Sequence, residues 1–581
     1  MAYRSLSDCV ADLERSGRLR RVEVELDPRL EIPAVQRLAC AAGGPALLFT
    51  RVRGSRFPML ANLFATGERA RYVLRHGYRA VEATMALKAD PRRFWRYPGL
   101  PLSLLSCLPR RVPTGPVLTG RTRLRELPQL VCWPEDGGAF LTLPAVYSED
   151  PARPGWLRSN LGMYRCQISG NDYEPDRECG LHYQLHRGIG IHHARALERG
   201  QPLPVNVFLG GPPALTLAAV MPLPEGLPEI AFAGLLAGRP LAWARAGALS
   251  VPVECDFCLV GRIHPGRLKP EGPFGDHLGY YSLRHDFPVL EVEAVYHRPD
   301  AIFPFTTVGR PPQEDSVFGQ IIHELTAPVL PTVLPGVHAV NAVDEAGVHP
   351  LLLALASERY TPYQKRTRPQ ELLTAANAIL GHGQLSLAKY LFLAAREDDP
   401  GLDVHQVERF LAHVLERVDW RTDLHFQTQT TLDTLDYSSG TMHQGSKLVV
   451  AAVGPARRQL GRDSPEGFCL VMPGVLATDR PPEACAELGE EWPLVVRCDD
   501  PAFLARRLAN FLWITFTRSD PARDVHGVGE FTEHKHWGCT GALVIDARLK
   551  PHHAPALAED PAALSKARSL AAPGGPLHGV F

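Results

Sequence analysis

Two carboxylates, Glu271 and Asp276, stand five residues apart in a stretch rich in glycine and proline. Residues 271–281 read Glu-Gly-Pro-Phe-Gly-Asp-His-Leu-Gly-Tyr-Tyr, which predicts a rigid, irregular turn rather than a helix. Two carboxylates on such a loop suit proton transfer, because different surroundings can drive their pKa values apart. The alternative is an acidic surface turn at the end of a strand, and these residues alone do not decide between the two.

A second stretch, residues 159–167, places an amide and a guanidinium five residues apart in a strand-like, aromatic-containing run. These are Asn160 and Arg165. A buried arginine needs a carboxylate or phosphate partner. Arg165, Glu271 and Asp276 can therefore form an acid–base triad in which the arginine keeps one carboxylate ionised. The sequence does not show that the three meet in space.

Three motifs, in this order along the chain, resemble the UbiD-type decarboxylases, which use prenylated FMN. They are Asn160-x-Gly-x-Tyr-Arg, His186-Arg-Gly and the carboxylate loop of residues 271–281. The resemblance runs from about Ser5 to about Ala452. It implies reversible, non-oxidative decarboxylation of an aromatic or α,β-unsaturated acid through a covalent adduct with the cofactor. Asp276 then corresponds to the proton donor, and Glu271 and Arg165 to the partners that order the network and help to mature or hold the cofactor.

The same resemblance implies a metal site and a cofactor site. Asn160 and Glu229 match the family's Mn²⁺ or Mg²⁺ ligands, which clamp the flavin phosphate to the protein. His186 matches a third ligand of some relatives and would favour manganese, although a hydrogen-bonding core histidine is the equal alternative. A potassium ion would lie beside the metal, near Ala218, Ala219 and Met221. The cofactor-contacting positions are Met163, Tyr164, Arg165, Leu185, His186, Arg187, Gly188 and Lys389.

Two of these residues carry a signal of their own. Glu229 follows a proline-spaced turn, residues 222–228, which fixes its approach and suits a ligand, although solvated surface glutamates are common. Lys389 stands alone in an apolar run, residues 385–393, and a buried lysine demands an anion. The alternative is that the aliphatic part of the Lys389 side chain lies along the core while its charged amino group reaches water. The resemblance supplies the flavin phosphate as that anion.

Composition limits the classes of function. The formal net charge is −1 over 581 residues and no basic face is evident, so nucleic acid is not an expected partner. The 12 cysteines, including the pair Cys255 and Cys258, are expected to be reduced thiols. The N-terminus lacks a hydrophobic signal core, and the apolar runs are too short to span a bilayer. We therefore expect a cytoplasmic protein.

The fold class is α/β (α+β). A short helix at residues 5–16 and strands at 19–26 and 46–50 predict an N-terminal α/β domain, residues 1–125. Short strands broken by glycine and proline predict a β-rich domain at 126–315, which the resemblance makes a split β-barrel of the flavin-reductase type. A C-terminal α/β domain at 316–453 and an extension at 454–581 follow. The expected barrel strands are residues 141–148, 162–167, 204–209, 242–246 and 289–297.

The extension repeats a pattern of the preceding domain. In both regions a helix (403–418; 502–516) precedes a turn with two aspartates four apart, and a strand follows (448–452; 542–545). We infer a duplicated helix–turn–strand unit. Residues 454–490 are expected to be a linker, and the tail from Pro555 to be mobile or packed on a partner subunit. In having these additional C-terminal residues, the chain resembles a longer bacterial branch of the UbiD-type decarboxylases. Some members of that branch are linked to menaquinone synthesis by the futalosine route.

The resemblance also implies partners. They are a small acid substrate, a flavin prenyltransferase as cofactor supplier, and further copies in a homodimer or homohexamer. Loose membrane association is expected if the substrate is prenylated. One departure is that Asp256 and Val260 replace two usual glutamates, which leaves the substrate open among quinone-pathway, hydroxybenzoic and heteroaromatic acids. One alternative function is a flavin-binding scaffold without turnover. Another is a metal-dependent hydrolase that uses Asn160, His186 and Glu229, but the sequence has no HExxH motif to support it.

Overall fold

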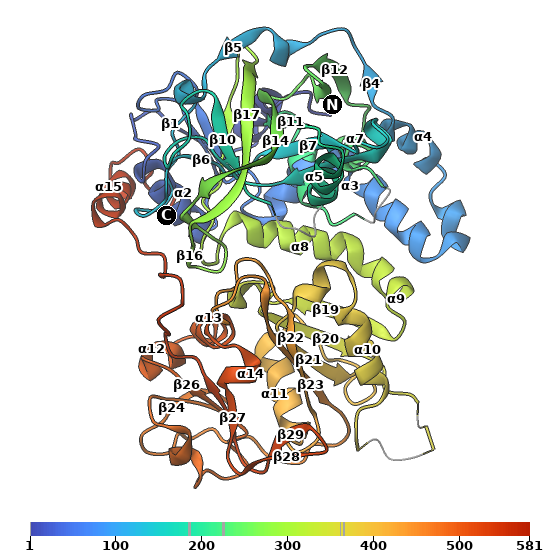
Figure 1. The fold of residues 1–581 in the computed structure, drawn as a ribbon, viewed down its shortest axis with the longest axis vertical. Helices are drawn as coiled ribbons and strands as arrows, with labels where there is room; N and C mark the ends of the chain where they lie inside the picture. The colour runs from blue at the N-terminus through green and yellow to red at the C-terminus, as the bar shows by residue number, and fades with distance from the viewer. Residues whose placement is uncertain (1, 184–187, 224–226, 361, 364–366) are drawn as a thin grey trace. The chain divides into compact units, whose positions relative to one another are not determined.

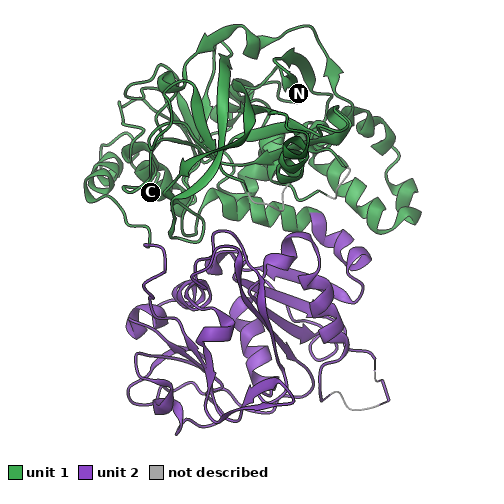
Figure 2. Ribbon diagram, viewed as in Figure 1, with its two compact units in different colours: residues 1–325, 556–581 green, residues 326–555 purple. Residues whose placement is uncertain are grey.

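The computed structural model describes residues 2–183, 188–223, 227–360, 362–363 and 367–581, and it divides into two compact units (Figure 2). The first unit holds residues 1–325 together with 556–581, and the second holds residues 326–555. The last segment of the chain therefore belongs with the N-terminal part, and not with the extension in which we had expected it. None of the described helices is long and apolar enough to cross a bilayer.

The first unit begins with α1 (Leu6–Arg15), whose N-terminus is capped by Ser5. The Ser5 side chain accepts a hydrogen bond from the Asp8 amide at 3.1 Å. β1 (Leu19–Val22) is shorter than the predicted strand, because Leu26 makes an isolated bridge with Val52 instead. The four-stranded sheet has the order β1-β2-β3-β18, with β2 (Ala46–Phe49), β3 (Met59–Ala61) and β18 (Phe303–Pro304).

A nine-stranded, curled sheet forms the centre of the first unit (Figure 1). Its two longest strands, β14 (Phe257–Glu271) and β17 (His285–His297), pair antiparallel, with register shifts that bend the sheet. A mixed α/β fold with a curled sheet is thus present, whereas its closure as a split barrel stays a prediction. The order is β6-β9-β10-β17-β14-β11-β7-β8, with β5 on β17: β5 (Gly120–Thr122), β6 (Phe140–Leu141), β7 (Ala145–Glu149), β8 (Ser159–Met163), β9 (Cys166–Gln167), β10 (Glu178–Leu181) and β11 (Leu203–Leu209).

Buried helices support the strands that carry the predicted ligands. α6 (Pro213–Val220) and α7 (Glu229–Ala237) are apolar on nearly every side, and almost all of their residues are buried. α3 (Gly67–Ala89) crosses α7 at Gly77, where an added Cβ would lie 2.2 Å from the carbonyl oxygens of Leu235 and Leu236. Only glycine permits so close a crossing, which lies at the carboxyl end of α7, the helix that begins with Glu229.

The second unit contains two five-stranded sheets. Their orders are β19-β20-β21-β23-β22 and β24-β25-β26-β30-β27. We expected residues 454–490 to be a linker, but they contain β24 and β25, the first strands of the second sheet. The strands are β19 (Val337–Ala342), β20 (Leu351–Ala356), β21 (Tyr390–Ala395), β22 (Leu424–Thr431), β23 (Gln444–Ala452), β24 (Cys469–Met472), β25 (Val475–Thr478), β26 (Leu494–Arg497), β27 (Val525–Gly527) and β30 (Leu543–Asp546).

The C-terminal tail packs into the first unit. Its helix α15 (Pro561–Ala571) begins at Asp560, whose side chain accepts from the Ala563 amide at 2.7 Å. Lys566 forms an ion pair of 2.7 Å with Glu31 of α2 (Glu31–Ala41), and Leu577 is fully buried. The tail is therefore an integral part of its own chain's core, where we had expected a mobile segment or a contact with a partner subunit.

The cysteines are free thiols, as expected, and most are buried. Cys255 and Cys258 lie beside the start of β14 with no disulfide between them. The neighbouring Asp256 is fully buried and accepts hydrogen bonds from the amides of Gly211 (2.7 Å) and Ile302 (3.0 Å). This departure from the family motif thus joins the start of β14 to two other segments of the backbone.

Candidate active site

Arg165 binds both predicted carboxylates. Its Nε and Nη2 donate to Glu271 at 2.8 and 2.9 Å, and its Nη1 donates to Asp276 at 2.5 Å. All three side chains are buried: 9% of Arg165, none of Glu271 and 10% of Asp276 is exposed to solvent. A planar guanidinium suits this arrangement, because its fork can hold one carboxylate in a bidentate pair and still reach a second.

Irregular backbone positions these three groups. Arg165 lies in the break between β8 and β9, where we had expected one continuous strand. Glu271 is the last residue of β14, and Asp276 follows the two-residue strand β15 (Phe274–Gly275). The predicted irregular turn is thus confirmed.

Three side chains hold this loop by its backbone. Asp136 accepts from the Gly275 amide at 2.8 Å, and Gln167 accepts from the Gly272 amide at 2.9 Å. Asn171 donates to the Gly272 carbonyl at 2.8 Å. The two carboxylates are therefore supported by hydrogen bonds that do not involve Arg165, so the loop does not depend on the ion pairs alone.

Both carboxylates are ionised in this arrangement. Burial by itself would raise the pKa of Glu271, but the charge of Arg165 and the contact with His182 hold that pKa well below its usual value. Burial also acts to raise the pKa of Asp276, and the bonds from His277 together with the Arg165 charge lower it below its usual value. Asp276 accepts from the His277 amide at 2.7 Å. The cluster thus contains two negatively charged carboxylates and one positively charged arginine.

Two further residues complete the site and were not foreseen from the sequence. His182 Nδ1 lies 3.1 Å from Glu271 and 2.9 Å from Arg165, and the centre of its ring lies 4.1 Å from that of Phe287, with the two planes tilted by 31°. Burial, followed by the positive charge of Arg165, lowers the pKa of His182, so the imidazole is neutral. Ser282 accepts a hydrogen bond of 2.6 Å from Arg165. The available signal was their position: His182 directly follows β10, and Ser282 directly follows the carboxylate loop.

The C-terminal tail joins the loop that carries Asp276. The Leu557 amide donates to the Gly279 carbonyl at 3.0 Å, and Ala556 forms an antiparallel bridge with Tyr280. The same loop closes on itself, because the Asp276 amide donates to the Tyr280 carbonyl at 3.0 Å. A segment at the far end of the sequence therefore helps to fix the backbone of a candidate catalytic residue.

Replacing Leu557 by proline should loosen this loop, because proline has no N–H to donate to Gly279. Losing one such bond costs about 0.5–1.5 kcal/mol, so we expect faster amide exchange in residues 276–280 and a kcat lower by roughly threefold to tenfold. Leu557→Ala, which keeps the N–H, and Ala558→Pro, one residue further, are the controls. Equal exchange rates in Leu557→Pro and Leu557→Ala would show that the bond does not hold the loop.

Asn160 and Glu229, the predicted metal ligands, are brought close together. Glu229 begins α7 and accepts from the amide of Leu161, the neighbour of Asn160, at 3.0 Å. Burial raises the pKa of Glu229 to about 7, and in the part of the chain that the structure describes this carboxylate has no cationic partner. A half-buried carboxylate without a counter-charge beside an amide oxygen is a donor set that suits a hard divalent cation.

The other predicted cofactor and metal residues are distributed as follows. Leu185, His186 and Arg187 lie outside the described residues. Gly188 begins α5 (Gly188–Glu198), and a Cβ added there would come within 2.3 Å of the Asn160 side-chain oxygen, so glycine keeps this approach open. Met163 ends β8 and the Tyr164 hydroxyl lies 3.4 Å from the Asn160 amide group. Ala218, Ala219 and Met221 are buried at the carboxyl end of α6, where the carbonyls of Ala218 and Met221 accept from the amides of Met221 (3.3 Å) and Leu223 (2.9 Å).

Lys389 belongs to the second unit and is almost fully buried, with 1% of its side chain exposed. An anion does lie beside it: Asp436 Oδ2 is 2.7 Å from Nζ, and Ser438 Oγ is 2.9 Å away. The alternative of a solvated lysine head is therefore wrong. The contact of Lys389 with a flavin phosphate stays a prediction.

Comparison with known proteins decides the family. Sequence models of three domains of 3-octaprenyl-4-hydroxybenzoate carboxy-lyase (UbiD) match this chain: the N-terminal domain at residues 10–87, the Rift-related domain at 110–311 and the C-terminal domain at 316–452. The chain belongs to the UbiD carboxy-lyase family. Arg165, Glu271 and Asp276 all lie within the residues that match the Rift-related domain.

Relatives of similar length occur in Chlamydia. A protein of Chlamydia trachomatis is 38% identical over 574 residues, which are 94% of this chain and 95% of that one. A Chlamydia pneumoniae protein, named as one of the subunits of 4-hydroxybenzoate decarboxylase, is 37% identical, with 93% of each chain covered. These relatives extend well beyond residue 452, where the UbiD domain models end. Residues 454–581 are thus not peculiar to this UbiD protein.

Solved structures share the fold. Vanillic acid decarboxylase of Sedimentibacter hydroxybenzoicus in its closed form superposes with a TM-score of 0.67 at 22% identity, covering 80% of this chain and 97% of that one. HmfF of Pelotomaculum thermopropionicum in complex with FMN gives 0.59 at 24% identity, covering 80% and 98%. Since those chains are covered almost completely, about a fifth of this UbiD protein has no counterpart in them.

Proposed function

We propose that this protein is a prenylated-FMN-dependent decarboxylase that removes CO₂ from an aromatic or α,β-unsaturated carboxylic acid. The observation that carries the proposal is the buried contact of Arg165 with both Glu271 and Asp276. Such a cluster is costly to bury unless its groups are paired, and it sets two carboxylates in different surroundings. The name of the Chlamydia pneumoniae relative agrees with this reaction class.

The cofactor is the part of the chemistry that the chain does not supply. Bound prenylated FMN would serve as the electron sink that an sp² carbon needs when it loses CO₂. Solved HmfF structures contain FMN or prenylated FMN, which supports a flavin in this fold. In our proposal the first unit binds it as a split β-barrel of the flavin-reductase type, with Met163, Tyr164, Arg165 and residues 185–188 as contacts. Lys389, a residue of the second unit, is the further proposed contact.

Asp276 delivers the proton that replaces the carboxyl group. Overall, R–COO⁻ and one proton give R–H and CO₂, so a proton must enter the site in each turnover. Asp276 is ionised in the free protein, and an anionic substrate placed beside it would raise its pKa and favour uptake of that proton. Glu271 stays ionised, because its bidentate bond to Arg165 and its contact with His182 stabilise the charge. It orders the arginine and does not supply the proton.

The proposed metal is Mn²⁺, or Mg²⁺, held by Asn160, Glu229 and His186, with K⁺ near residues 218–221. A cation at Glu229 would neutralise a phosphate group and remove the cost of an unpaired half-buried carboxylate.

Affinity for Mn²⁺ should depend on pH through Glu229. The ligand must be deprotonated to bind, and its pKa is about 7. Below pH 7 a proton competes with the metal, so the dissociation constant should rise about tenfold per pH unit, and it should level off above about pH 8. Calorimetric titration with Mn²⁺ measures this. Glu229→Gln should bind weakly with a flatter pH profile, whereas Glu198→Gln, on the exposed side of α5, should match wild type.

The function is tested by co-expression with a flavin prenyltransferase. Under the proposal the purified protein carries a modified-flavin absorption band and releases CO₂ from at least one of several acids: hydroxybenzoates, vanillate, dihydroxynaphthoates and heteroaromatic acids. Exchange of labelled bicarbonate into the substrate would show that the reaction is reversible. A loaded protein that releases CO₂ from none of them would favour a flavin-binding scaffold. Activity on a naphthoate would support a place in menaquinone synthesis, and light scattering would distinguish a homodimer from a homohexamer.

A further inference from the structure

The two sheets of the second unit have the same topology. In the first, β19 is antiparallel to β20, β20–β21 and β21–β23 are parallel, and β23 is antiparallel to β22. In the second, β24, β25, β26, β30 and β27 repeat that pattern step by step. Matching of strand order and of every strand direction over five strands points to two copies of one domain.

The turns before the last strand pairs match in detail. The Asp419 amide donates to Asp423 at 2.8 Å, and the Asp520 amide donates to Asp524 at 2.7 Å. The next residues occupy the same register, because Leu424 pairs with Val450 and Val525 with Ile545. Since Phe392 pairs with Val450 and Val496 with Ile545, the position of Lys389 in the first copy is Pro493 in the second. The second copy therefore lacks the buried lysine.

The second copy touches the first copy around that lysine. We call residues 519–524 the Asp turn and residues 432–443 the lysine loop, since the latter includes Asp436 and Ser438. From the Asp turn, the Ser519 hydroxyl lies 2.7 Å from the hydroxyl of Tyr390, next to Lys389. Asp520, which is buried, accepts from the amide of Ser446 at 3.0 Å, just beyond the lysine loop.

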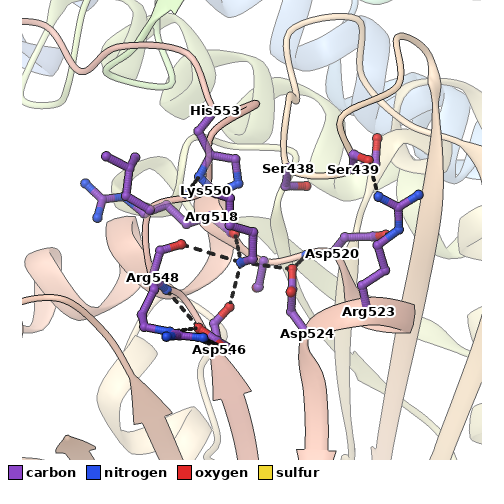
Figure 3. Close-up of polar contacts among 12 residues, drawn as sticks. Ser438, Ser439, Arg518, Asp520, Arg523, Asp524, Asp546, Arg548, Lys550 and His553 are labelled. Carbon is purple, nitrogen blue, oxygen red and sulfur yellow. Dashed lines mark hydrogen bonds and ion pairs between the residues drawn. The ribbon is translucent and has the colours of Figure 1, made fainter. Parts of the chain in front are cut away.

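Two side chains of the extension hold the lysine loop itself. Arg523 donates to the Ser439 carbonyl at 2.7 Å, as Figure 3 shows. His552 Nε2 lies 3.0 Å from the Ser438 carbonyl oxygen, and its ring packs against Gly440, where a Cβ would come within 3.2 Å. Ser438 in turn binds both Lys389 and Asp436. The chain of contacts thus runs from the extension through the loop to the lysine.

The rest of Figure 3 shows how the Asp turn is fixed. Lys550 Nζ forms an ion pair of 3.2 Å with Asp524 and donates to the backbone carbonyls of Arg518 (3.2 Å) and Asp546 (3.0 Å). Asp524 is buried, and burial raises its pKa, so a cation at this point stabilises its charged form. The turn and the segment that carries His552 are thereby tied together.

We propose that residues 454–555 of the extension are a second copy of the C-terminal domain that has become a brace for the first, with Arg523 and His552 as positioning residues for Lys389 and its loop. The inference rests on the proposed function, in which Lys389 contacts the flavin phosphate. Neither residue touches the cofactor in this proposal. They restrict the lysine loop, so that Lys389 and its partners are already arranged when the flavin binds.

The test is the double variant Arg523→Ala/His552→Ala. Both side chains lie at the surface, so the fold should survive, with a Tm within about 2 °C of wild type. We expect amide exchange in residues 432–443 to speed up about tenfold and the affinity for FMN to fall roughly threefold to tenfold. Arg523→Lys, which keeps a cationic donor, should recover part of the loss. Arg548→Ala/His534→Ala removes the same residue types elsewhere in the extension and should change neither quantity.

Unchanged exchange in residues 432–443 would overturn the brace, whatever happens to FMN binding. Faster exchange with unchanged FMN affinity would overturn the positioning role. If wild type failed to bind FMN, the proposed function would fail, while the exchange data would still decide whether the extension holds the loop.

Discussion

Asp276→Asn should lose decarboxylation while it keeps its flavin. The amide has the size of the carboxyl group and can still accept from Arg165, but it cannot deliver a proton to carbon. General acid catalysis contributes about 10²- to 10⁴-fold, so we expect kcat to fall by that range. Flavin absorbance of the purified variant, compared with wild type, shows whether the cofactor is retained, and CO₂ release measures turnover.

The matched control is Asp172→Asn, an aspartate in the same unit with 71% of its side chain exposed. It should turn over at the wild-type rate. Normal turnover in Asp276→Asn would show that the proton comes from another group. Loss of both turnover and flavin would instead mean that Asp276 holds the site together, which would also contradict the assignment.

Arg165→Leu should destabilise the first unit strongly. It leaves Glu271 and Asp276 buried without their shared counter-charge, and removing one partner of a buried pair costs about 3–5 kcal/mol. Chemical denaturation at pH 7 measures the loss. The exposed pair Arg177–Glu174, at 3.0 Å, gives the control, since Arg177→Leu should cost less than about 1 kcal/mol. Equal losses in the two variants would mean that Arg165 is not a required counter-charge.

The pH dependence gives a second check. In wild type the pKa of Glu271 is lowered by its partners, so its contribution is complete above about pH 4.5 and is lost as pH falls below that value. In Arg165→Leu the charge that most lowers the pKa of Glu271 is gone, and only the contact with His182 would oppose burial. We expect burial to dominate and raise the pKa, so the folded variant would bind more protons than the unfolded one. Its stability should then fall as pH rises above about 4.5. The deficit relative to wild type should be large at pH 7 and shrink towards pH 4.

Local chemistry in the sequence was sufficient for several short elements and for naming Arg165, Glu271 and Asp276 as candidates. α1 lies within the predicted helix and Glu229 begins α7, because caps and prolines act over a few residues. Residues 242–246 do form a strand, β12 (Ala242–Ala246), but it belongs to a separate three-stranded sheet and not to the sheet in which we had expected it, since strand pairing is not local. Arg165, Glu271 and Asp276 were named from residue type and spacing, since a buried arginine needs carboxylates. The break at Arg165 was missed, because nothing local distinguishes a strand that is interrupted there.

What only the tertiary structure decided depends on contacts between residues far apart in the chain. His182 and Ser282 joined the site because separate strands bring them to Arg165, and no spacing rule encodes that meeting. Asp436 beside Lys389, and the tail beside Tyr280, are likewise non-local. The sequence by itself determined that Arg165 and Lys389, if buried, would each need an anionic partner. The tertiary structure determined which residues became the partners of these charges, because burial and pairing depend on packing in three dimensions.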